Sequence, residues 1–249
     1  MMIQKRSITP VKWFLFLAIA GGLHALSGCG GGGEESSETD SNTQEQPAAT
    51  GDTTTPRVTP ATGTAENSPF NSAKKEATIT NPVVIFRTSH GEITVELDAK
   101  NAPVTVDNFL ANYVERDFYN DTIFHYVESG MIVGGGYDSE NQLKDTRAPI
   151  FCEADNGLSN KRGTLAMART PGDAHSATSQ FFFNLADNTD FDHQSTESPD
   201  TYGYCVFGKV TGGLAVLDKI AGVATTETEI SPSIPAEPVV IRKVEVIKR

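Results

Sequence analysis

The sequence predicts a mainly β domain, a barrel or a sandwich, that begins near residue 79. Many short stretches of β-branched or alternating residues are separated by turn signals, and only two stretches have helical spacing. The chain has 249 residues, of which 38 % are hydrophobic, which allows one moderate domain with additional segments. Many strands with few helices are typical of an all-β core rather than of a layered α/β fold.

The first two strands are predicted at residues 82–88 and 92–97, on either side of a tight turn. The turn is Ser89-His90-Gly91, and the second stretch alternates with a period of two, as expected for a hairpin. Further strands are predicted, in chain order, at residues 123–127, 132–134, 163–168, 180–185, 204–210 and 239–247.

Two helices are predicted between these strands. Pro103 suits the first turn of a helix, because its missing N–H has no partner to lose there. The residues of this stretch that fall on one helical face are Val106, Phe109, Leu110, Tyr113 and Val114. The second helix is expected at residues 214–221.

The first 28 residues are typical of a bacterial secretory signal. Lys5 and Arg6 precede the apolar residues 13–20, a run too short to span a bilayer. The run ends at Leu26-Ser27-Gly28-Cys29, which resembles a lipobox, in which Cys29 becomes the acylated N-terminus. A plain cleaved signal and an ordinary membrane anchor are the alternatives. We therefore expect a lipoprotein with a palmitate-type anchor, held extracytoplasmically in the cell envelope.

The residue after Cys29 bears on which membrane holds the protein. Gly30 stands there rather than an aspartate, which by resemblance to enterobacterial sorting rules indicates the outer membrane, on the periplasmic side.

Residues 29–78 are predicted to be a flexible tether. Their composition changes to Gly, Ser, Thr, Pro, Glu and Asn, and such a segment cannot bury enough apolar surface to offset its ordering entropy. A random coil of about 45 residues has a root-mean-square reach of about 35–40 Å. That length would hold a domain clear of a membrane surface.

The net charge and the cysteines exclude two classes of ligand. A formal net charge of −12 provides no electrostatic footprint for nucleic acid. No Cys-x-x-Cys pair or His/Cys cluster is present, so a zinc site is unsupported. Cys152 and Cys205 could form a disulfide in an oxidising compartment, or they could be two separate buried thiols, which is the simpler interpretation.

Four segments carry a resemblance to a known family. They are NAPVTVDNFLANYVERDFYNDTIFH, CEADNGLSNKRGTLAMART, HSATSQFFFNLADN and GYCVFGKVTGGLAVLDKIAGVAT. In order and spacing they resemble the cyclophilins, and the resemblance covers residues 82–249. It implies a closed eight-stranded antiparallel barrel capped by two α-helices. It also implies a groove on one outer face that binds Xaa-Pro segments of polypeptides and catalyses their cis/trans isomerisation, in a protein that we expect to be a monomer.

The implied chemistry needs no nucleophile, metal or cofactor. The barrier to rotation is about 18–20 kcal/mol because the C–N bond has partial double-bond character. An apolar pocket that holds the proline ring, together with a donor directed at the prolyl nitrogen, stabilises the twisted state more than the ground state.

The resemblance assigns residues of this chain to the groove. The positions matching the catalytic part are His125, Tyr126 and Gln180. Those matching the substrate-binding part are Phe124, Met131, Ala168, Arg169, Phe182, Phe191 and Tyr204. His125 is interpreted as a structural hydrogen-bonding residue rather than a general base, since the reaction transfers no proton.

Four departures from the family pattern fall on this groove. Tyr126 stands where the family has the arginine that supplies the donor, and Val133 replaces the glutamine that braces that arginine. The segment from Glu128 to Met131 is one residue short, and Asp190 occupies a position that is often Trp or Phe.

These departures leave two functions open. A charge-assisted hydrogen bond contributes about 1.5–3 kcal/mol and a neutral one about 0.5–1.5 kcal/mol. Tyrosine in place of arginine therefore predicts a loss of about ten- to thirtyfold in rate. The loss would be about 10²–10³ if the hydroxyl cannot reach the prolyl nitrogen. The sequence predicts an isomerase of reduced or altered activity, or a non-catalytic proline-peptide-binding module or holdase. Arg169 is a candidate replacement donor, although its place in the GTLAMAR pattern indicates the groove rim.

The remaining histidines have simpler interpretations. His90 and His193 are expected to be solvated. His175 with Asp173 and Ser176 suggests a hydrolase triad, but the Gly-x-Ser-x-Gly sequence of a nucleophile elbow is absent from the chain.

Overall fold

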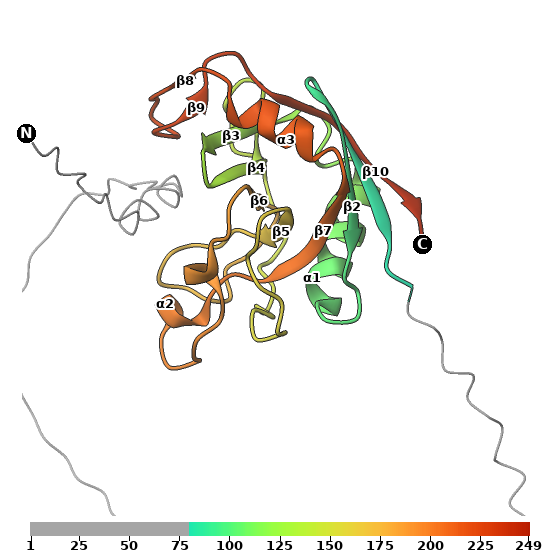
Figure 1. Cartoon of the computed structure of the whole chain (residues 1–249), viewed down its shortest axis with the longest axis vertical. Coiled ribbons are helices and arrows are strands. Elements are labelled where there is room, and N and C mark those ends of the chain that lie inside the picture. The colour runs from blue at the N-terminus through green and yellow to red at the C-terminus, as the bar shows by residue number, and fades with distance from the viewer. Residues whose placement is uncertain (1–79) are drawn as a thin grey trace, which may run out of the picture. The chain divides into compact units, whose positions relative to one another are not determined.

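The computed structural model describes residues 80–249, and the predicted signal, Cys29 and the tether lie outside the described residues. Eight of its strands are β1 Val83–Thr88, β2 Gly91–Leu97, β3 Thr122–Glu128, β4 Met131–Asp138, β5 Thr164–Met167, β6 Phe181–Asn184, β7 Val206–Gly212 and β10 Val240–Lys248. They form a closed antiparallel barrel in the order β1-β10-β3-β4-β6-β5-β7-β2 (Figure 1). The predicted barrel is confirmed.

The two predicted helices are present. The first is α1 Pro103–Asp107, which continues as a π-helical segment, Asn108–Tyr113, and a 3₁₀ turn, Val114–Arg116. The second is α3 Leu214–Ala221, which packs against β2, β3 and β4 and lies across the upper part of the barrel in Figure 1. None of the helices within residues 80–249 has the length and apolar character needed to cross a membrane.

Four short elements were not predicted from the sequence. They are helix α2 Pro199–Tyr202, the 3₁₀ turn Thr189–Phe191, and the paired strands β8 Thr225–Thr226 and β9 Ile234–Pro235. Each is too short to produce a recognisable period. Helix α2 begins where the Ser198 hydroxyl accepts a hydrogen bond from the Asp200 backbone N–H at 3.2 Å, with Pro199 in its first turn.

Aromatic side chains fill the inside of the barrel. Phe86 lies edge-on to Phe181 and Phe183, with ring centroids 5.4 Å apart in both pairs. Phe109, from the helical segment, packs against Phe181 and Phe207, so the helix seals the same core. Edge-to-face contacts among buried rings add to the burial of their apolar area.

Strand β4 is longer than predicted because three consecutive glycines do not interrupt it. The prediction ended at residue 134, whereas β4 reaches Asp138. Gly135 has φ +82°, and a Cβ there would lie 2.7 Å from Cε1 of Phe181. A Cβ on Gly136 would lie 2.7 Å from the side chain of Gln180. Glycine is required at both positions because neighbouring side chains occupy the space of a Cβ.

A bulge in β3 decides which side chains face outward. Phe124 pairs with Gly134 while Tyr126 pairs with Val133, so two residues of β3 advance against one of β4. Phe124 points into the barrel core, and the bulge turns Tyr126 to the outer face, although strict alternation would place both on one face. Val127 points inward again.

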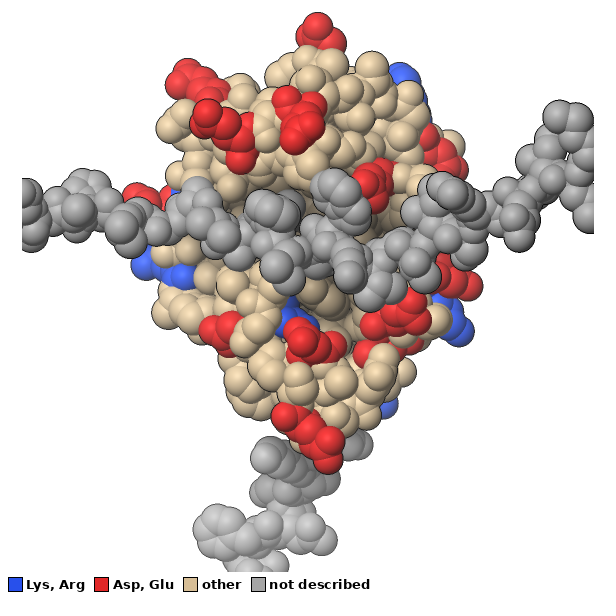
Figure 2. All heavy atoms as spheres, turned by 90° about the vertical axis from the view of Figure 1, so that its left-hand side faces the viewer, with Lys and Arg blue, Asp and Glu red and all other residues tan. Residues whose placement is uncertain are grey.

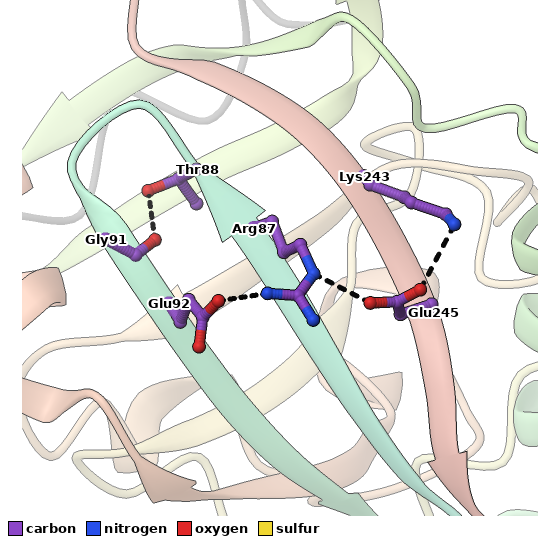
Figure 3. A network of polar contacts seen from close by, with 6 residues as sticks. All are labelled: Arg87, Thr88, Gly91, Glu92, Lys243 and Glu245. Atoms are coloured by element: carbon purple, nitrogen blue, oxygen red, sulfur yellow. Dashed lines mark hydrogen bonds and ion pairs between the residues drawn. The ribbon is translucent and has the colours of Figure 1, made fainter.

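A network of charged side chains crosses the outer surface of β1, β2 and β10 (Figure 3). The Arg87 guanidinium contacts Glu92 on β2 and Glu245 on β10, and Lys243 reaches Glu245 at 3.1 Å. At the adjoining turn, the Thr88 hydroxyl donates to the Gly91 carbonyl at 2.7 Å. The pairs are solvent-exposed and screened by salt, so they fix strand register more than they add stability.

Candidate active site

An apolar cluster on the outer face of the barrel brings most of the predicted groove residues together. We call it the outer cluster, and its buried members are Tyr126, Met131, Val133, Ala166, Phe182 and Val206. Partly buried residues that pack against them are Leu158, Ala168, Phe191 and Tyr204. The neighbours of these residues along the same strands point into the barrel core, as the two-residue period requires.

Three rings form the aromatic part of the outer cluster. Phe182 lies edge-on to Phe191, with centroids 6.1 Å apart and planes at 86°. Tyr204 lies edge-on to both, at 5.7 Å from Phe182 and 5.4 Å from Phe191. Rings set at steep angles to one another present both faces and edges, which suits contact with a compact aliphatic ring such as that of proline.

A buried asparagine positions two of these rings. Asn160 is fully buried, and its side-chain N–H groups donate to the backbone carbonyls of Phe191, at 3.2 Å, and Tyr204, at 3.3 Å. The Asp192 carboxylate accepts from the Asn160 backbone N–H at 2.7 Å. Satisfied buried networks of this kind fix one arrangement of the segments they join.

The same network reaches the turn between β3 and β4. Asn184 donates to the side chain of Asn160 at 3.1 Å and accepts from Asn188 at 2.7 Å. Asn188 also donates to the Gly130 carbonyl at 2.9 Å. The end of β3 is thereby tied to the segment that carries Phe191.

Arg169 lies at the margin of the outer cluster. Its guanidinium stands 4.5 Å from the Tyr204 ring centroid, and its Nε and one Nη donate to the carbonyls of Gly203, at 3.0 Å, and Pro199, at 2.7 Å. These bonds hold the α2 segment against the cluster. Arg169 therefore positions a loop at the rim, and the two N–H groups that make these bonds are directed at protein carbonyls rather than at a bound peptide.

Tyr126 lies in the outer cluster with its side chain 9 % exposed. Burial raises the pKa of its phenol, and the neighbouring Glu128 carboxylate, which interacts with the hydroxyl, raises this pKa further. The phenol is therefore protonated at neutral pH, with a single hydrogen to donate. Val133 pairs with Tyr126 across β3 and β4, and its apolar side chain offers no hydrogen bond to the hydroxyl.

His125 and Gln180 lie together, and the Gln180 backbone carbonyl accepts a hydrogen bond at 2.9 Å from the N–H of Ala168, a residue of the outer cluster. His125 is fully buried, and its ring centroid stands 4.8 Å from that of Tyr137. Burial lowers the pKa of His125 to about 4, although the Ile123 backbone and the Gln180 side chain favour the protonated form. Neither ring nitrogen reaches a partner at regular hydrogen-bond geometry. The imidazole is neutral at physiological pH and does not reach the surface.

The prediction that Phe124 binds substrate is not supported by its position. Phe124 is fully buried in the barrel core, 6.4 Å from Phe181 between ring centroids. The bulge in β3 accounts for this, because it separates Phe124 from the outward-facing Tyr126. The predicted groove residues that lie in the outer cluster are Tyr126, Met131, Ala168, Phe182, Phe191 and Tyr204. Arg169 lies at the margin of this cluster, and Gln180 lies beside His125.

Several residues of the site carry no signal in the sequence. Leu158, Ala166 and Val206 are ordinary apolar residues, and the chain neighbours of Ala166 and Val206 face the core. Asn160 lies in a loop where asparagine is common. Its role is shown only by its burial and by its hydrogen bonds to the Phe191 and Tyr204 carbonyls. A buried loop asparagine is recognised from the structure alone.

A cavity of about 480 Å³ lies elsewhere on the barrel. It is lined by Asn112, Tyr113, Arg116, Asp117, Phe118, Lys144, Asp145, Thr146 and Arg147, none of which was predicted to bind substrate. The outer cluster, not this cavity, carries the residues whose chemistry fits the predicted reaction.

The residues of the suggested hydrolase triad do not form one. The Ser176 hydroxyl donates to the Asp173 backbone carbonyl at 2.8 Å, and His175 Nδ1 accepts from the Cys152 backbone N–H at 3.2 Å. Cys152 and Cys205 are free buried thiols, which agrees with the simpler interpretation of the two cysteines. Burial raises the pKa of Cys205 to about 12.

The fold and the outer cluster define a closed antiparallel β-barrel protein whose candidate binding surface lies on its outer wall. Comparison with known proteins makes the class specific. The profile of the family described as "Cyclophilin type peptidyl-prolyl cis-trans isomerase/CLD" matches residues 83–246. The chain belongs to this family.

Relatives of known description share much of the sequence. Peptidyl-prolyl cis-trans isomerase B of Escherichia coli is 50 % identical over 165 residues, which are 66 % of this chain and 99 % of that protein. Peptidyl-prolyl cis-trans isomerase A of Dickeya dadantii is 47 % identical over 174 residues, 70 % of this chain and 88 % of that protein.

A solved structure agrees in fold. A cyclophilin-type isomerase of Cryptosporidium parvum aligns with a TM-score of 0.52 at 22 % identity, covering 68 % of this chain and 99 % of its own.

Proposed function

We propose that this protein is a peptidyl-prolyl cis-trans isomerase that acts on Xaa-Pro bonds of extracytoplasmic proteins, with turnover reduced by Tyr126. Membership of the cyclophilin-type family supports the isomerase class, EC 5.2.1.8. The observation that carries the proposal is the outer cluster, in which Met131, Phe182 and Phe191 converge on one face of the barrel. These side chains match the positions that the family resemblance assigns to the proline pocket.

The outer cluster supplies the apolar half of the reaction. Rotation about the C–N bond removes its conjugation, so the prolyl nitrogen gains a lone pair in the twisted state. Holding the proline ring among Met131, Phe182 and Phe191 while the preceding residue turns lowers the barrier only if the twisted state is bound more tightly than either planar state. A donor near the nitrogen provides part of that difference.

Reduced turnover is expected because of the hydrogen-bond donor, which is the polar part of the site. Tyr126 is the member of the outer cluster at the family's arginine position, and its neutral hydroxyl replaces a guanidinium. A neutral donor in place of a charged one weakens transition-state stabilisation by about 1–2 kcal/mol, which corresponds to about ten- to thirtyfold in rate. Arg169 does not offset this, since its bonds to Gly203 and Pro199 hold it at the rim.

The cellular setting is proposed from the N-terminal sequence. The signal-like residues 1–28 and the lipobox-like cysteine, Cys29, support a lipid anchor on the periplasmic side of the cell envelope. Mass spectrometry of the cell-derived protein tests this, because an acylated Cys29 as the first residue is expected. A mature N-terminus elsewhere contradicts the anchor and leaves the isomerase proposal unaffected.

Isomerisation of a short Xaa-Pro peptide tests the activity. Weak but measurable turnover is expected from the native chain, and Tyr126→Arg is expected to raise kcat/KM about tenfold. Glu140→Gln, in the exposed turn beyond β4, serves as the control and leaves turnover unchanged. Absence of turnover in the native chain and in Tyr126→Arg, with peptide binding retained, would replace the proposal with a proline-peptide-binding module on the same fold.

A further inference from the structure

The register of β3 places a carboxylate next to the phenol that occupies the donor position. Tyr126 and Glu128 are two residues apart, after the bulge, so both side chains leave the same outer face of the strand. Val127 between them points into the core, and its backbone N–H donates to the Ser233 carbonyl at 2.9 Å. This fixes the strand on which both side chains stand.

The phenol and the carboxylate interact, and the interaction has a direction. An ionised carboxylate can only accept, and a phenol has one hydrogen to donate. The strand register brings the two side chains together on one outer face, so a hydroxyl hydrogen directed at the Glu128 carboxylate is the arrangement that suits both groups. In that orientation the oxygen offers lone pairs to the outer cluster, whereas the prolyl nitrogen of a twisting bond requires a donor.

Arg162, which lies near the turn after Glu128, is already bound to the Leu185 carbonyl and to the Asp218 carboxylate. The bond from Asn188 to Gly130 brings the turn after Glu128 beside the segment with Asp187 and Asp190. All three acidic side chains are exposed, and none takes part in an ion pair within residues 80–249. Acidic side chains also predominate over basic ones on the face of the barrel shown in Figure 2.

We propose that Glu128 is a positioning and specificity residue of the isomerase site. It holds the Tyr126 hydroxyl hydrogen away from the prolyl nitrogen until a Lys or Arg side chain of the client, close to the proline, pairs with the Glu128 carboxylate. The client cation then releases the hydroxyl, which donates to the nitrogen as the bond twists. The inference rests on the proposed isomerase function and names its substrate class, Xaa-Pro segments with a basic residue nearby.

A peptide series tests the inference directly. The peptides share one Xaa-Pro pair and differ by Lys, Gln or Glu at the residue before or after that pair. Exchange between cis and trans is measured by NMR without a coupling protease, so that peptide charge affects the isomerase alone. The native chain is expected to show about tenfold higher kcat/KM for Lys than for Glu at low ionic strength. The preference is expected to diminish at 0.5 M salt, because screening weakens exposed pairs.

Substitution of the carboxylate separates this role from a structural one. Glu128→Gln is expected to abolish the preference for Lys and to raise kcat for the Gln peptide several-fold. Both effects are expected to vanish when Tyr126→Phe is already present, because Glu128 acts through that hydroxyl. The matched control, Glu140→Gln, removes an exposed glutamate beyond β4 and leaves the preference intact.

The outcomes distinguish the proposed role of Glu128 from the proposed isomerase function. Equal turnover of the Lys and Glu peptides by the native chain, or a preference that survives Glu128→Gln, overturns the role of Glu128 and leaves the isomerase function standing. An effect of Glu128→Gln that persists with Tyr126→Phe overturns the path through the phenol. Absence of exchange with every peptide, in the native chain and in Tyr126→Arg, overturns both proposals.

Discussion

Glu153 accepts hydrogen bonds from both the backbone N–H of Thr105, at 2.8 Å, and its hydroxyl, at 2.7 Å. The carboxylate also accepts from the Val104 N–H at 3.1 Å. A residue distant in the chain thus satisfies the N–H groups that the first turn of α1 leaves without helical partners. A negative charge at a helix N-terminus is favourable in itself.

Glu153→Ala is expected to lower the free energy of unfolding by about 1–3 kcal/mol, because it leaves three donors without their acceptor. Glu153→Gln should cost less, since its one amide oxygen can still accept from Thr105, while its NH2 group loses the bond from the Val104 N–H together with the charge. The midpoint of urea unfolding measures both. Glu140→Ala, at an exposed turn, is the control, and an equal loss there would mean that the cap contributes nothing.

His125 is expected to make stability depend on pH between about 4 and 6.5. Its pKa is about 4 in the folded chain and about 6.5 when unfolded. In this range the unfolded chain binds a proton that the folded chain does not. The contribution of His125 to the free energy of unfolding is therefore fully present above pH 6.5. It is lost as the pH falls toward 4, by about 3 kcal/mol in all.

Unfolding midpoints measured across this pH range test the assignment. His125→Phe should flatten the dependence, and His90→Gln, in the β1–β2 turn, should not. An unchanged slope in His125→Phe would show that other groups titrate.

Phe191→Ala is expected to lower kcat/KM for a neutral Xaa-Pro peptide by about tenfold, mainly through KM. The phenyl ring is partly exposed and forms one side of the aromatic part of the outer cluster, so its loss removes contact with the proline ring in every state of the reaction. Leu143→Ala removes an exposed apolar side chain outside the cluster and serves as the control. A fall in kcat at unchanged KM would contradict the proposed role in binding.

Asn160→Ala is expected to reduce stability by about 2–4 kcal/mol and to weaken turnover as well. It removes the side-chain donor to the Phe191 and Tyr204 carbonyls and leaves the Tyr204 N–H, at 2.8 Å, as a donor to the Phe191 carbonyl. Thermal unfolding and steady-state kinetics measure the two effects. Turnover that survives while stability falls would show that the rings hold their places without Asn160.

Cys152 and Cys205 are expected to resist thiol reagents in the folded chain. Burial raises the pKa of both thiols and excludes the reagent. In a Cys29→Ser form, a chromogenic disulfide at pH 8 should find almost no thiol before denaturant is added and two afterwards. Rapid reaction of either thiol without denaturant would mean that the barrel opens locally.

The sequence pattern predicted a mainly β barrel or sandwich because its strands and helices keep their periods over enough residues, and the family resemblance specified the closed eight-stranded barrel. The alternation in β2 and the helical face from Val106 to Val114 were sufficient for their elements. Helix α2, with four residues, is defined by Ser198 and by the arginine that binds its loop rather than by any period.

The site was predicted less completely, for a physical reason. The family resemblance assigned Phe124 to substrate binding and Tyr126 to the catalytic part of the groove, but the bulge between them sends one ring into the core and the other outward. Bulges depend on the pairing with β4, which a linear pattern does not contain. The placement of Tyr126 and Glu128 on one outer face depends on the same bulge.

The barrel is closed by its first strand against its last, with Val83 paired to Lys248 and Phe86 to Val244. A chain emerging residue by residue from a ribosome therefore holds an unsatisfied β1 edge until β10 arrives. Completion of the barrel is tied to the synthesis of β10. Loss of β10, Val240–Lys248, would expose the edges of β1 and β3 at once, which would favour aggregation.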